Sequence, residues 1–108
     1  MSLLEMQSLI QNLSPAEKAL VLQWVARDLH GAFAGIESRA DVLGGEACVI
    51  RTRIPVWLLV QLQRFGASEA DLLRDYPSLR AEDLTNAWAF AAAHPKRIET
   101  EMALNEAA

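Results

Sequence analysis

Cysteine and histidine are scarce in this sequence, which limits the chemistry open to it. Cys48 is the single cysteine among 108 residues, so an internal disulfide is excluded. The two histidines, His30 and His94, stand far from Cys48 and from each other, and no CxxC, HxxxH or HExxH spacing occurs. Metal sites need several such side chains at ligand spacing. We therefore expect no metal, no cofactor and no enzymatic activity.

Long apolar runs and a secretion signal are also missing. No run reaches the roughly 18 uncharged apolar residues of a membrane span, and residues 1–12 lack the basic start and cleavage site of a signal peptide. By elimination, we expect a cytoplasmic protein without membrane contact. The hydrophobic fraction of 52% supports a buried core, and the net charge of −4 mildly disfavours binding to a polyanion.

Residues 1–31 predict a helical hairpin that forms an N-terminal arm. Apolar residues at steps of three and four mark its first helix; these are Leu3, Met6, Leu9, Ile10 and Leu13. A capping box formed by Ser14 and Glu17 predicts the start of a second helix, and Gly31 predicts its end. A unit of this size cannot bury its own apolar stripe. We therefore expect the arm to pack on the rest of the chain or on a second copy in a homodimer.

Residues 32–94 predict a core of two short strands and three helices. The strands are expected near residues 36–38 and over residues 47–50. Of the three helices that follow, the middle one is short, because a capping box begins it at Ser68 and a proline after Tyr76 ends it. This mainly α layout matches a trihelical helix-turn-helix core preceded by a short β-hairpin.

Residues 95–108 are predicted to form a tail after Pro95, which we expect to bound the last core helix. The apolar stripe of the tail is weak, so we expect it to become helical only against a partner. Its candidate partner-binding residues are Ile98, Met102 and Leu104. Because the tail is acidic, a basic protein suits it better than DNA does.

A short cationic stretch, Arg51-Thr52-Arg53, is the first candidate for nucleic-acid binding. In an extended conformation Arg51 and Arg53 would point to the same side of the chain. Two guanidinium groups on one turn suit phosphates or the carboxylates of a partner protein. The alternative is that one or both arginines stabilise the turn through carbonyl or acidic groups nearby.

The last core helix supplies the second set of candidates for nucleic-acid binding. Asn86 is the residue best suited by type to read a base edge, and Arg80 precedes the helix. Glu82 and Asp83 in the first turn oppose the approach of phosphates. An ordinary packing helix with a solvated face is therefore the favoured interpretation.

Two sequence blocks resemble the family known as domain of unknown function 433. The first is GGEACVIRTRIPVW over residues 44–57, and the second runs from Gly66-Ala67-Ser68 to Tyr76-Pro77-Ser78-Leu79. The resemblance extends over roughly residues 36–94. Two positions depart from the family pattern: Arg51 replaces Gly or Asn, so it either strains the turn or marks a different one. Arg80 replaces a capping Thr, which forfeits about 1 kcal/mol unless Ser78 caps the helix instead.

The resemblance implies a homeodomain-like helix-turn-helix core and no catalytic residues. It also implies a VapB-type antitoxin that binds a PIN-like toxin nuclease, with repression of its own operon through operator DNA as an accompanying expectation. Two alternatives stay open. One is a stand-alone DNA-binding regulator, and the other is a structural homodimer with no nucleic-acid role.

Overall fold

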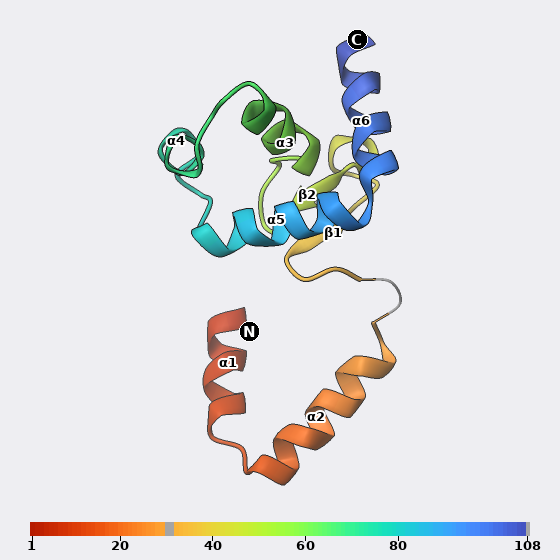
Figure 1. Ribbon diagram of the computed structural model, residues 1–108. Coiled ribbons are helices and arrows are strands. Elements are labelled where there is room, and N and C mark those ends of the chain that lie inside the picture. Colours follow the sequence, from red (N-terminus) through yellow and green to blue (C-terminus); the bar gives the residue numbers. More distant parts are fainter. Residues whose placement is uncertain (30–31, 108) are drawn as a thin grey trace. The chain divides into compact units, whose positions relative to one another are not determined.

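The computed structural model describes residues 1–29 and 32–107 and divides the chain after residue 31 into two compact units (Figure 1). The first unit contains α1 (Leu3–Gln11) and α2 (Pro15–Arg27). The second contains a two-stranded sheet followed by four helices.

The two helices of the first unit begin where the sequence predicts them. The Ser2 hydroxyl accepts a hydrogen bond from the Glu5 N–H at 3.1 Å and caps α1. Ser14 and Glu17 complete the predicted capping box of α2, each side chain accepting a hydrogen bond from the other's backbone N–H. Every residue of α1 and α2 remains exposed or half-buried. The predicted end of α2 at Gly31 lies outside the described residues.

The second unit opens with the predicted β-hairpin. Strands β1 (Ile36–Ser38) and β2 (Ala47–Val49) pair antiparallel, with Ile36 opposite Val49 and Ser38 opposite Ala47. The connecting loop contains a short 3-10 turn, η1 (Leu43–Gly45). All three residues of β2 are buried, because the hairpin packs on α3 and α5. Cys48 is among them, as expected for a cysteine that behaves as a small hydrophobe.

Helices α3 (Val56–Arg64), α4 (Glu69–Asp75) and α5 (Ala81–Ala93) follow the hairpin in the predicted order. Ser68 and Asp71 form the capping box that begins α4, and the chain leaves the helical conformation at Tyr76, before Pro77. Leu59, Leu72 and Leu84, one from each helix, are fully buried where the three helices meet. The mainly α fold with a preceding β-hairpin is therefore confirmed.

The tail differs from its prediction. Pro95 starts a further helix, α6 (Pro95–Ala107), which packs against α3 and α5 (Figure 1). Ile98 and Met102 are 2% and 6% exposed and belong to the hydrophobic core of their own chain. Their assignment as partner-binding residues was wrong, because burial within this unit removes them from any external surface. Leu104 is 66% exposed and stays a candidate for partner contact.

Candidate functional site

The turn between β2 and α3, residues 50–54, is held by backbone contacts and by one side chain. The Ile50 N–H donates to the Gly35 carbonyl at 3.0 Å. The Thr52 hydroxyl donates to the Val49 carbonyl at 2.8 Å and accepts from the Ile54 N–H at 3.1 Å. Both hydrogen bonds of the Thr52 hydroxyl are therefore used to shape the turn. We call residues 50–54 the arginine turn.

Arg51 adopts a left-handed backbone conformation in the arginine turn, with φ of 61°. This conformation costs an L-residue with a Cβ atom about 1–2 kcal/mol. Of the two possibilities that the family pattern left open, the structure shows the first, a strained turn. Residues held in strained conformations cluster at functional sites, which makes Arg51 a candidate site residue.

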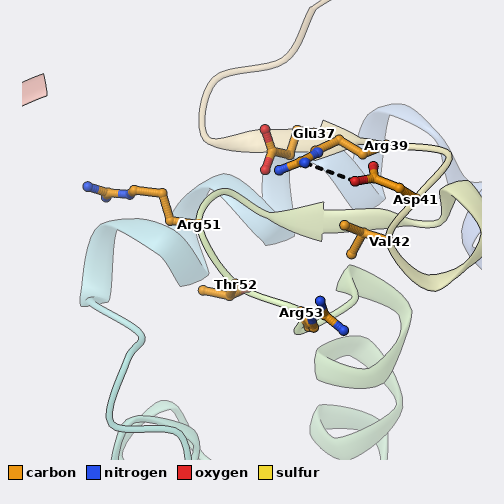
Figure 2. A pocket seen from close by; sticks show the side chains of 7 residues that line it. All are labelled: Glu37, Arg39, Asp41, Val42, Arg51, Thr52 and Arg53. Carbon is orange, nitrogen blue, oxygen red and sulfur yellow. Dashed lines mark hydrogen bonds and ion pairs between the residues drawn. The ribbon is translucent and has the colours of Figure 1, made fainter. Parts of the chain in front are cut away.

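Arg51, Thr52 and Arg53 line a shallow pocket of about 360 Å³ beside the hairpin (Figure 2). Its other lining residues are Glu37, Arg39, Asp41 and Val42. The guanidinium of Arg39 is neutralised by Asp41, since Nη2 lies 3.1 Å from the Asp41 carboxylate. Arg51 and Arg53 are exposed and form no ion pair with any residue that the structure describes.

The guanidinium groups of Arg51 and Arg53 do not point to the same side of the turn. The predicted common direction requires an extended chain, whereas residues 50–52 form a turn. Figure 2 shows Arg51 pointing outward from the rim of the pocket, away from Arg53 and Arg39. The arginine turn therefore presents two separate cations, each able to bind a different anionic group.

The start of α5 places Arg80 and Asn86 differently. Arg80 is the N-cap residue of the helix: its backbone N–H donates to the Asp83 carboxylate at 2.8 Å, and its Nη1 lies 3.6 Å from Glu82. No side-chain hydroxyl, from Ser78 or from another described residue, caps the N–H groups of the first turn. Asn86 is half-buried and its side chain lies next to Gly35, just before β1. A Cβ atom at Gly35 would lie 2.5 Å from Asn86 Nδ2.

A polar network that the sequence did not predict joins the hairpin, α3 and α6. Glu46 accepts hydrogen bonds from Trp57 Nε1 and Asn105 Nδ2, both at 2.7 Å. Glu101 accepts from Arg97 Nε at 3.1 Å and from the Ala47 N–H at 2.9 Å. The spacing of four residues between Arg97 and Glu101 is the one sequence signal that indicated part of this network. The network anchors α6 and is therefore structural.

The Cys48 thiol is buried in β2. Burial, followed by the nearby charge of Glu46, raises the pKa of the Cys48 thiol, so the reactive thiolate is disfavoured. Within residues 1–29 and 32–107, no group of three or more His, Cys, Asp or Glu side chains is placed to bind a metal. None of the helices in this described part of the chain is long and apolar enough to cross a membrane.

Comparison with known proteins places this site in a wider context. Residues 36–91 match the family described as "Protein of unknown function (DUF433)". The chain is 37% identical over 70 residues to the uncharacterized protein y4eO of Sinorhizobium fredii (strain NBRC 101917 / NGR234), covering 65% of this chain and 32% of that protein. It is also similar to the crystal structure of a DUF433 member protein from Anabaena variabilis ATCC 29413. There the TM-score is 0.66 and the identity 35%, with 95% of this chain and 99% of that chain covered. The chain thus spans about a third of the length of the Sinorhizobium protein.

Proposed function

We propose that this chain, which belongs to the DUF433 family of proteins of unknown function, is a non-catalytic, antitoxin-like protein that binds a PIN-like toxin nuclease and represses its own operon. The observation that carries the proposal is the unpaired Arg51 guanidinium. It projects from a turn whose backbone is strained at this residue, with φ of 61°. Strained residues cluster at functional sites, which supports a binding role for Arg51.

A guanidinium in this position suits the active site of a nuclease. Nucleases that use divalent cations gather carboxylates around the scissile phosphate. Arg51 supplies a planar group of N–H donors that pairs with carboxylates in two-point hydrogen bonds. Arg53, exposed in the same turn, adds a second cation, and Leu104 on α6 offers an apolar contact. Occupation of the carboxylates by Arg51 would block both metal and RNA.

The proposal is tested by co-expression with a PIN-like nuclease encoded beside this chain. We expect the two proteins to co-purify and RNA cleavage by the nuclease to fall when this chain is added. The double variant Arg51→Ala/Arg53→Ala should bind at least tenfold more weakly. Arg74→Ala is the matched control, because Arg74 is exposed but already paired with Asp71 and Asp75. Absence of a complex, or equal loss in the control, would overturn the proposal.

DNA binding through α3, α4 and α5, acting as the proposed helix-turn-helix, is supported by the position of Asp83. Asp83 is 7% exposed and accepts a hydrogen bond from the Arg80 backbone N–H, while Glu82 is paired with the Arg80 guanidinium. Asp83 is therefore turned away from the surface that a phosphate would approach, and the charge of Glu82 is balanced by its pairing with Arg80. Operator DNA would then contact Arg51, Arg53 and Arg80.

The DNA-binding activity is tested by measuring retention of the upstream operator fragment over a range of salt concentrations. Each phosphate contact contributes about −0.9 to the slope of log K against log salt. Arg51→Ala and Arg53→Ala should each reduce that slope by about 1. A stand-alone regulator would show this behaviour without any nuclease partner. If both variants bind DNA with the same salt slope as the unaltered protein, the arginine turn does not contact DNA.

A further inference from the structure

The N-terminal helix pair exposes an unusual amount of apolar surface. Leu22 is 69% exposed, and Leu9, Trp24 and Leu29 are each more than half exposed. By contrast, the second unit closes a core of its own from residues 36–102. The apolar surface of α1 and α2 therefore has no cover within its own unit.

The geometry of the helix pair explains why so little is buried. Figure 1 shows α1 and α2 splaying apart from their connection, and the two helices hardly contact one another. Leu20, Val21 and Leu22 are consecutive apolar residues of α2. At 100° per residue, they cover an arc of about 200° around the helix axis. A stripe that faces one neighbour needs about 100°. Helix α2 thus has an apolar surface wide enough for α1 and for a further partner.

Helices of this length need such a partner to persist in water. α1 has 9 residues and α2 has 13, which is at or below the length at which isolated helices are marginal. Their caps contribute about 1 kcal/mol each, which is small against the entropy of ordering the chain. Packing of the apolar faces must supply the remaining stabilisation.

We propose that the cover is a second copy of the same helix pair, so that two chains interlock their arms as a four-helix assembly. The exposed large apolar residues of one arm offer on the order of 1,000 Å², against about 800 Å² per partner in a stable interface. Residues 1–29 carry three acidic and two basic groups, so two identical arms repel each other little.

The test is the molar mass of the full chain in sedimentation equilibrium. We expect twice the 11.9 kDa of one chain. The double variant Leu22→Glu/Leu29→Glu should sediment as a monomer with an unchanged thermal unfolding transition of the second unit. Phe65→Glu is the matched control, since Phe65 is 79% exposed at the end of α3, and it should remain a dimer. A monomeric wild type, or a dimer that survives the double variant, would overturn the proposal.

Site-specific crosslinking tests the interface directly. Cys48 is buried, so a cysteine introduced by Leu29→Cys provides the accessible thiol in each chain. A short bis-maleimide should join Leu29→Cys chains in high yield and Phe65→Cys chains in low yield; the reverse order would contradict an arm–arm interface. Arg51→Ala/Arg53→Ala should crosslink normally in the Leu29→Cys background. Failure of the dimer and failure of the proposed nuclease or DNA binding are therefore distinguishable.

Discussion

The carboxylate of Glu101 accepts a hydrogen bond from the backbone N–H of Ala47, 54 positions earlier in the chain, at 2.9 Å. Glu101 is 8% exposed, and its second oxygen accepts from Arg97. Arg97 in turn donates to the Ser38 hydroxyl and the Gly45 carbonyl. One carboxylate on α6 thereby closes the end of the β-hairpin and links the last helix to the first strands of its unit.

Replacing Glu101 should destabilise the second unit strongly. Glu101→Ala leaves the Ala47 N–H without its acceptor inside the fold, which costs about 1–3 kcal/mol. Chemical denaturation followed by circular dichroism measures this loss in the free energy of unfolding. Glu106→Ala is the control, because Glu106 is exposed and its partner among the described residues is the exposed side chain of Gln61. Equal effects of the two substitutions would contradict the role assigned to Glu101.

Relieving the strain at Arg51 should make the protein more stable. Glycine adopts φ of 61° without steric cost, so Arg51→Gly should raise the free energy of unfolding by about 1 kcal/mol. The same variant should bind a nuclease or operator more weakly. Arg53→Gly is the control, since Arg53 has no positive φ and gains nothing from glycine. A less stable Arg51→Gly protein would show that the side chain stabilises the turn.

A side chain at Gly35 should be tolerated poorly. Gly35 and Gly44 both have left-handed φ angles, of 72° and 65°, so alanine strains both positions by about 1 kcal/mol. At Gly35 the new Cβ also meets Asn86 Nδ2 at 2.5 Å, whereas at Gly44 nothing lies within 4 Å. The melting temperature of Gly35→Ala should therefore be lower than that of Gly44→Ala. Adding Asn86→Ala to Gly35→Ala should recover part of the difference; additive losses would argue against the contact.

Acidification should loosen the start of α4 through Asp71. Hydrogen bonds from the Ser68 backbone N–H and hydroxyl hold the pKa of Asp71 below its ordinary value of 3.8. A lowered folded-state pKa stabilises the protein above pH 3.8, and this contribution is lost as the pH falls through the folded value. A carboxyl NMR titration reads the pKa directly. Asp71→Asn should abolish the acid response of the Ser68 amide. An Asp71 pKa at its ordinary value would contradict this prediction.

Local signals in the sequence predicted most of the element boundaries. The capping boxes at Ser14 and Ser68 depend on hydrogen bonds between residues three apart, so they act wherever the chain places them. A short strand near residues 36–38 was predicted to pair with a second strand in the apolar run of residues 47–50, and the structure pairs residues 36–38 with residues 47–49. The tail was mispredicted, because α6 buries few residues and its apolar stripe is correspondingly weak.

The arrangement of the two candidate arginines differs from the prediction that they point to the same side. Arg51 and Arg53 are exposed and unpaired within the described chain, as the functional interpretation requires. The different directions of their side chains follow from the turn that Thr52 holds. The contact of Asn86 with Gly35 joins residues 51 positions apart, which no local pattern encodes.

The sequence by itself determined where helices begin, that the chain is mainly α, and which family it belongs to, because these depend on neighbours within a few positions. The tertiary structure alone decided that Ile98 and Met102 are core residues and that Asp83 faces inward. It also showed that the helices of the arm bury none of their residues within their own unit. Burial is a property of surfaces brought together from distant parts of the chain, so its outcome appears only when they pack.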